Sequence, residues 1–257
     1  MIGKISEIKD NLLGKEFKTK KCGKCFIIDY KNYNEVLVIF YEPFCIVKCS
    51  LGSLQKGHVS NPMFPTILGK GYIGVGKYNS KNCGRIYSLW LGVLRRCLSD
   101  RHLSYKDITV CDEWLNFQNF AAWCESQSFY NAKDIRGKSY HLDKDILVKG
   151  NKVYSPNTCR FVPSNINNLI LSKKTLRGDL SLGVTFKKGK FYAQMTGGCS
   201  ERKSTLVLGY FNTEEEAFNA YKNAKELYIK DVANRFVDYI DSDIYESLLK
   251  WSVNKDD

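Results

Sequence analysis

The first quarter of the chain alternates short apolar runs with Gly, Asn and Pro positions that are typical of tight turns. Each run is too short for a helix and is rich in β-branched or aromatic residues, so each predicts a strand. Four or five such strands over residues 1–75 predict a small SH3-like β-barrel. The clearest runs are residues 16–17, 25–30, 36–40 and 44–47.

Helical periodicity begins after residue 83. One apolar stripe recurs at i, i+3, i+4, i+7 and i+11, and it predicts an amphipathic helix. A second, aromatic-rich helix is expected over 112–124, with its aromatic side chains in the core. Residues 140–168 then indicate strand, tight turn, strand and short helix. The first stripe consists of Tyr87, Trp90, Leu91, Leu94 and Leu98.

The last part of the chain predicts three strands followed by a helix. The strands cover 182–187, 190–196 and 204–211, and the K-K-G-K sequence between the first two is a hairpin turn. Thr213 and Glu216 form a capping box at the start of the helix. A final apolar pattern, which includes Ile244 and Leu248, predicts a helix that either packs back on this domain or supports self-association, with packing favoured.

The predicted fold class is therefore α+β, with three regions. Residues 1–75 form the small SH3-like β-barrel, and residues 83–172 form helices followed by a ββα finger. Residues 178–257 form a three-stranded antiparallel sheet backed by a helix, with a further C-terminal helix.

Charge adds a partner class to this outline. The 257 residues carry a formal net charge of +12 and the isoelectric point is about 9.1, which favours a polyanion such as nucleic acid. Residues 173–210 hold eight Lys or Arg against two acidic residues, whereas residues 211–257 hold six against eleven. The predicted sheet is therefore basic and its helix acidic, so the sheet is the better surface for DNA.

Other composition features narrow the setting. No apolar run is long enough to span a bilayer, and the N-terminus lacks a signal-peptide pattern, so we expect a cytoplasmic protein without membrane partners. Ten cysteines without such a signal favour reduced thiols. Cys22, Cys25, Cys45 and Cys49 have loose zinc-site spacing, but apolar core thiols are the favoured interpretation and zinc the alternative.

The segments G-V-T-F-K-K-G-K-F-Y-A-Q-M from Gly183 and L-V-L-G-Y-F-N-T-E-E-E-A-F-N-A-Y from Leu206 resemble the plant ethylene-response-factor (Apetala-two) DNA-binding domain. The resemblance implies a sheet that lies in the major groove of double-stranded DNA. The base-facing residues that it implies are Thr185, Lys187, Gln194, Thr196, Thr205 and Val207. Phosphate contacts would come from Lys188, Lys190, Arg202 and Lys203.

Residues 85–235 as a whole resemble phage-encoded HNH homing endonucleases, whose finger holds one divalent metal. Leu142-Asp143-Lys144 matches the first strand of that finger, residues 156–162 match its second element, and Asn167 matches its helix position. Lys144 then stands at the position of the general base, and Thr158 at that of the central Asn. The resemblance implies that Asp143, Asp145 and Asn167 hold Mg²⁺ and that Arg160 binds a phosphate.

Three functions follow as hypotheses. The first is a phage HNH-type, homing-endonuclease-like DNA endonuclease that finds its target through the C-terminal sheet. The alternative is a regulatory or accessory DNA-binding protein that keeps the finger as a catalytically degenerate scaffold. The third is an interaction module whose N-terminal barrel docks a phage or host protein; for a phage protein, each would act in the host cytoplasm.

Overall fold

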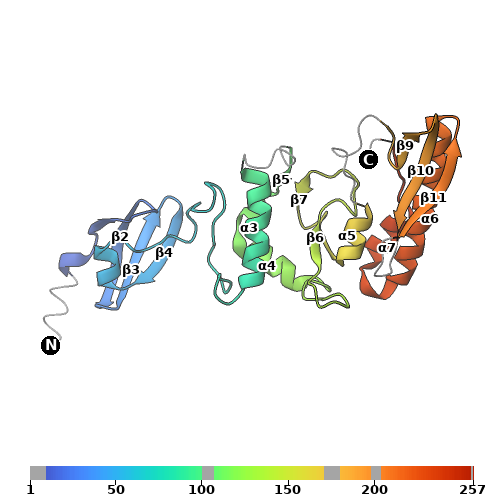
Figure 1. Cartoon of the computed structure of the whole chain (residues 1–257). Helices are drawn as coiled ribbons and strands as arrows, with labels where there is room; N and C mark the ends of the chain where they lie inside the picture. The colour runs from blue at the N-terminus through green and yellow to red at the C-terminus, as the bar shows by residue number, and fades with distance from the viewer. Residues whose placement is uncertain (1–9, 100–106, 171–179, 198–203, 256) are drawn as a thin grey trace. The chain divides into compact units, whose positions relative to one another are not determined.

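The computed structural model describes residues 10–99, 107–170, 180–197, 204–255 and 257 (Figure 1). The chain forms two compact units, Met1–Cys124 and Glu125–Asp257. Helices and antiparallel sheets occur side by side in the sequence, which confirms the α+β class. No helix in the described ranges combines the length and apolar character that a bilayer crossing needs.

A four-stranded antiparallel sheet begins the first unit, in the order β1-β2-β3-β4. Alternate residues of its strands are buried, as in Val36, Val38 and Phe40 of β3, because successive side chains point to opposite faces. The order leaves β1 and β4 at the two edges, and closure into an SH3-like barrel stays a prediction. The elements are β1 (Glu16–Lys18), β2 (Lys24–Asn32), β3 (Glu35–Tyr41), β4 (Phe44–Cys49) and α2 (Leu51–Gln55).

The expected aromatic-rich helix is divided in two. Asn116 is extended, because the backbone of Tyr72 bonds to both of its neighbours. The N–H of Tyr72 donates to the carbonyl of Leu115, and the carbonyl of Tyr72 accepts from the N–H of Phe117. The aromatic residues lie in the core, as predicted, with Trp90, Trp114 and Phe117 fully buried. The elements here are α3 (Gly84–Leu98), β5 (Thr109–Val110), η2 (Asp112–Leu115) and α4 (Phe117–Ser126).

The second unit contains the strand–strand–helix segment and the C-terminal sheet with its helices. The sheet has the order β11-β10-β9 and is antiparallel throughout, which confirms the three-stranded sheet predicted from the sequence. Its elements are β6 (His141–Asp143), β7 (Val153–Tyr154), β8 (Arg160–Val162), α5 (Ser164–Ile170), β9 (Val184–Lys187), β10 (Lys190–Gly197), β11 (Ser204–Phe211), α6 (Glu214–Arg235), η4 (Val237–Tyr239) and α7 (Ser242–Leu249).

Local chemistry explains how α6 begins. The Thr213 hydroxyl accepts from the backbone N–H of Glu216, and the Glu216 carboxylate accepts from the N–H of Thr213, each at 3.2 Å. The predicted capping box is therefore present. Three glutamates in the first turn also complement the positive end of the helix dipole.

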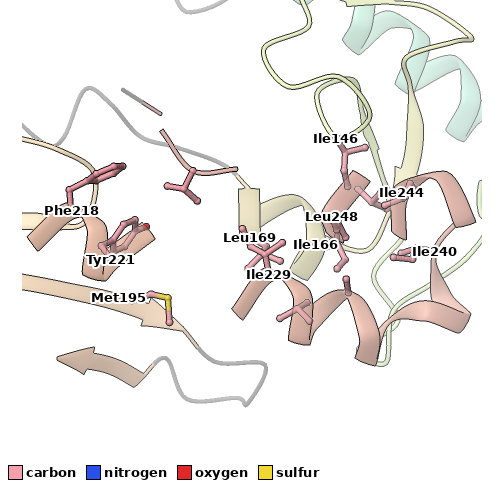
Figure 2. Packing of buried hydrophobic residues seen from close by; sticks show 14 of the residues in the cluster. Ile146, Ile166, Leu169, Met195, Phe218, Tyr221, Ile229, Ile240, Ile244 and Leu248 are labelled. Atoms are coloured by element: carbon pink, nitrogen blue, oxygen red, sulfur yellow. The ribbon is translucent and has the colours of Figure 1, made fainter. Parts of the chain in front are cut away.

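One apolar core joins the parts of the second unit. Ile166 and Leu169 of α5 lie in the same cluster as Met195 of the sheet and Ile229 of α6 (Figure 2). Ile244 and Leu248 of α7 complete it, so the C-terminal helix packs back on the unit, as the sequence favoured. The predicted boundary between residues 172 and 178 stays a prediction, but this core is continuous across the finger and the sheet.

Gly183 allows the start of β9 to approach α6, and its replacement tests that packing. Gly183 (φ 77°) and Gly189 (φ 75°) share the left-handed backbone, but a Cβ at position 183 would overlap the Tyr221 ring, whereas one at 189 has open space. We expect Gly183→Ala to lower the free energy of unfolding by about 2–4 kcal/mol and Gly189→Ala by about 1 kcal/mol. Urea unfolding measures both, and equal losses would contradict the close packing.

Candidate nucleic-acid interface and finger residues

The finger, residues 140–170, has the predicted order of strand, strand and short helix, but a long connection replaces the predicted tight turn between the paired strands. Strand β6 pairs with β8 in antiparallel register, with Asp143 opposite Arg160, and α5 follows β8 directly. Residues 144–159 connect the two strands and include the short β7. The hydrogen bonds that each predicted site residue makes here decide whether its side chain is available for a substrate or a metal.

Asp143 is a buried turn-forming residue. Its Oδ1 atom accepts hydrogen bonds from the backbone N–H groups of Asp145 and Ile146, both at 2.8 Å. Burial raises the pKa of this carboxyl group, and the two hydrogen bonds oppose the rise. The carboxylate therefore fixes the turn that follows β6.

Lys144, at the position of the general base, is buried and fully engaged. Its Nζ atom donates to Asp145 Oδ1 and to the carbonyl oxygen of Asn151, each at 2.6 Å. The Asn151 side chain donates back to the carbonyl oxygen of Lys144 at 2.8 Å. The amine uses its protons as donors here, whereas a general base must present a lone pair to water.

Thr158 and Arg160 also serve the loop. The Thr158 hydroxyl donates to the carbonyl oxygen of Val153 at 2.8 Å. Arg160 donates through Nε and Nη2 to the Asp243 carboxylate, at 2.9 and 2.7 Å, and through Nη1 to the carbonyl oxygen of Cys159 at 2.7 Å. Instead of being free for phosphate, the guanidinium ties β8 to α7.

A hollow of about 310 Å³ adjoins this ion pair. Its walls are polar, and burial raises the pKa of Asp241 there, with a further rise from the neighbouring Asp243. It lies beside Arg160 rather than beside Asp143 or Asn167, so it does not complete the predicted metal site. The lining residues are Ser126, Gln127, Ser128, Arg160, Asp241, Ser242 and Asp243.

The predicted magnesium ligands take part in bonds within the finger, and the magnesium site stays a prediction. Asp143 and Asp145 each use their Oδ1 atom for an internal bond, and the partner of Asp145 is the Lys144 ammonium group. Asn167 lies half-buried on α5. Among the described residues, no group of three or more His, Cys, Asp or Glu side chains is placed to hold a metal ion.

The zinc alternative in the first unit meets a similar arrangement. Cys22, Cys25 and Cys45 are buried, and Cys22 and Cys25 belong to the apolar core of the sheet. Burial raises the pKa of Cys25 to about 11 and raises the pKa values of Cys45 and Cys49. Neutral thiols packed in this way are typical of core cysteines.

The C-terminal sheet brings the predicted DNA-contacting residues together. We call the side of β9–β11 that faces away from α6 the outer face. Val184, Ala193 and Met195 are buried against the helix side, so the alternate residues of β9 and β10 lie on the outer face. Gln194 pairs with Val207 and Thr196 with Thr205, which adds β11 to the same face.

A bulge in β11 sets which residues of that strand face outward. Ala193 pairs with Gly209 but Gln194 pairs with Val207, so Leu208 is the extra residue. Leu208 packs against the core instead of alternating outward. Without this bulge, Thr205 and Val207 would lie on the opposite face from Tyr210.

Two tyrosines belong to the outer face although the sequence did not single them out. Tyr192 pairs with both Thr185 and Tyr210, and the two tyrosine rings lie 4.9 Å apart between centroids. Lys187 Nζ lies 4.6 Å from the centre of the Tyr192 ring. Strict alternation along β10 from Gln194 predicts that Tyr192 also faces outward. The outward position of Tyr210 follows only from the bulge in β11.

Lysines gather at the β9–β10 turn. Lys187 pairs with Lys190, and between them Lys188 (φ 53°) and Gly189 (φ 75°) have the left-handed backbone of a type I′ turn, as the K-K-G-K sequence predicts. All three lysines are exposed. Arg202 and Lys203, the other predicted phosphate contacts, lie outside the described residues.

Comparison with known proteins does not assign the chain to a family. No family model matches the chain, and no match was found among the curated proteins or the solved structures. The two resemblances drawn from the sequence therefore stay predictions.

Two replacements of Asp143 test its role in the turn. Asp143→Asn keeps an oxygen acceptor, so we expect a change below about 1 kcal/mol in the free energy of unfolding at neutral pH. Asp143→Ala leaves two backbone N–H groups without their acceptor and should cost about 2–4 kcal/mol. Urea unfolding distinguishes the two, and equal losses would contradict a turn-forming role.

The raised pKa of Asp143 gives the same pair a pH signature. The folded chain binds this proton more tightly than the unfolded chain does, so the carboxyl group's contribution to stability falls as pH rises from its unfolded to its folded pKa. Asp143→Asn should lack this decline when unfolding is measured from about pH 4 to pH 7.

Proposed function

We propose that the chain is a double-stranded-DNA-binding protein whose outer face lies against the duplex and whose finger serves as scaffold. The observation that carries this proposal is the outer face itself. Gln194, Thr196 and Thr205 share it with the lysines of one hairpin turn, whereas the Thr185 hydroxyl, which the resemblance placed at a base edge, is buried. Polar side chains in this arrangement suit base edges, and lysines at one end suit phosphates.

The dimensions and the charge of the sheet support the same surface. The major groove admits a two-stranded β-ribbon, and β10 with β11 is the longest antiparallel pair in the sheet. The helix behind the sheet begins with Glu214, Glu215 and Glu216. Its acidic end would be repelled by phosphates, so the basic face is the one that approaches DNA.

Each residue of the outer face has a role that follows from its chemistry. Gln194 can bond an adenine edge through both amide groups, and Val207 can contact a thymine methyl group. Lys190 reaches a phosphate, as predicted; Lys187, which the resemblance placed at a base edge, is assigned a phosphate here because it stands opposite Lys190 at the turn. Tyr210, whose side chain is 51% exposed, adds an apolar surface with a hydroxyl group at its end.

Lysine replacements test the outer face directly. Lys187→Gln and Lys190→Gln should each weaken binding to every duplex and reduce the slope of log affinity against log salt by about 1. Lys230→Gln, at an exposed position on α6, is the matched control and should change neither. Fluorescence anisotropy with labelled duplexes measures both quantities, and equal effects of all three variants would overturn the interface.

A second candidate is the metal-dependent endonuclease. The strand–strand–helix order of β6, β8 and α5 favours it, together with the carboxylates Asp143 and Asp145 at the end of β6. Its chemistry requires the ion pair between Lys144 and Asp145 to open, because that pair occupies the position of the base and one carboxylate. Because of this requirement, the endonuclease is the second candidate and DNA binding is the first.

Plasmid nicking separates the two functions. We expect the wild-type chain to bind supercoiled plasmid without nicking it in Mg²⁺ or Mn²⁺. Mg²⁺-dependent nicking that Asp143→Asn abolishes, while DNA binding persists, would establish the endonuclease and overturn the scaffold role. The Asn variant is suited to this test because it keeps the turn.

A further inference from the structure

An ordered turn with an exposed isoleucine precedes the finger. We call residues 133–139 the tip turn. Its backbone closes through two hydrogen bonds, from the N–H of Asp134 to the carbonyl of Lys138 and from the N–H of Gly137 to the carbonyl of Asp134, both at 2.8 Å. Gly137 (φ 73°) supplies the left-handed residue that this closure needs.

The Asp134 side chain holds the tip turn together. Its Oδ1 atom accepts from the backbone N–H groups of Arg136 and Lys138, both at 2.9 Å. Its Oδ2 atom accepts from the Ser164 hydroxyl at 3.3 Å, which links the turn to the start of α5. These hydrogen bonds lower the pKa of Asp134, so the carboxylate stays ionised at neutral pH.

The base of the tip turn is anchored as well. The N–H of Tyr140 donates to the carbonyl of Ala132 at 3.1 Å, and the buried Tyr140 ring stacks on Phe129 with 5.9 Å between centroids. The Tyr140 hydroxyl donates to the carbonyl of Tyr239 at 3.1 Å. The turn is therefore fixed at both of its ends within the second unit.

Ile135, at the end of this fixed turn, is 98% exposed. Burial of an isoleucine side chain stabilises a folded protein, and the folded chain does not gain that stabilisation here. Lys133, Arg136 and Lys138 surround it and are also exposed. The single acidic residue of the turn, Asp134, directs its carboxylate to backbone N–H groups of the turn and to the Ser164 hydroxyl.

We propose that Ile135 is an apolar wedge that inserts between stacked base pairs of duplex DNA while Lys133, Arg136 and Lys138 bind the flanking phosphates. The inference rests on the proposed DNA-binding function and adds to it a deformation of the DNA. A rigid turn suits this role, because unstacking a base step costs free energy and a mobile loop would yield instead of separating the bases.

Charge and size decide for DNA over other partners. The basic residues around Ile135 complement a polyanion, and a base step accepts a single apolar side chain. An anionic membrane offers the same charge, but stable binding to it needs a larger apolar surface than one isoleucine.

The test measures unwinding of DNA without knowledge of a target sequence. Relaxed closed-circular plasmid is incubated with the full chain and then with a topoisomerase, and the change in linking number is read on a gel. Anisotropy with a labelled duplex runs in parallel, to measure binding alone. We expect the wild-type chain to change the linking number, Ile135→Ser to abolish the change, and Ile135→Leu to retain it.

The controls separate this inference from the binding proposal. Val148→Ser, at an exposed position in the finger loop, should leave the linking number as in the wild type, and affinity for the duplex should fall less than about 10-fold in Ile135→Ser. Binding without any change in linking number would overturn the wedge and leave the DNA-binding function intact. Loss of duplex binding in the wild type itself would overturn both.

A third experiment, with anionic vesicles, tests a membrane surface as the partner of Ile135. Vesicles of phosphatidylserine and phosphatidylcholine should sediment the wild-type chain and Ile135→Ser equally. Sedimentation that depends on Ile135, without a change in linking number, would overturn the wedge in favour of a membrane contact.

Discussion

The contact of α5 with α6 and α7 is the interaction on which the second unit depends. Ile166 and Leu169 are the buried residues of α5, and both belong to the core that also holds Ile229, Ile244 and Leu248 (Figure 2). A seven-residue helix has little stability of its own. It persists because this apolar contact stabilises it, and the finger and the sheet are joined through the same contact.

Polar bonds around that core hold the residues that the sequence placed at predicted catalytic positions. Arg160 joins β8 to α7 through Asp243, and Lys144 joins the two sides of the finger loop through Asp145 and Asn151. Catalysis requires groups whose bonding capacity is left for the substrate. In this finger that capacity is used for folding, and the proposed DNA binding rests instead on the exposed polar side chains of the outer face.

Features with local causes could be predicted from the sequence. The Thr213 capping box and the turn of Lys188 and Gly189 depend on neighbours within four residues, and both are present. The Arg160–Asp243 pair joins residues 83 positions apart, and no sequence pattern indicates it. The division of the aromatic helix at Asn116 could not be predicted for the same reason, because it depends on hydrogen bonds from the distant backbone of Tyr72. Local chemistry thus gave the elements, whereas long-range bonds decided the side chains of the candidate site.

The bulge at Leu208 has a consequence for how the outer face could change over evolution. Deletion of Leu208 would restore regular alternation, because Val207 would then follow Gly209 directly and stay opposite Gln194, so Thr205 and Val207 would keep their place on the outer face. The bulge therefore absorbs a change of one residue in the length of β11. A codon gained or lost at this position preserves the surface, whereas the same change in a regular strand would turn half of that strand over.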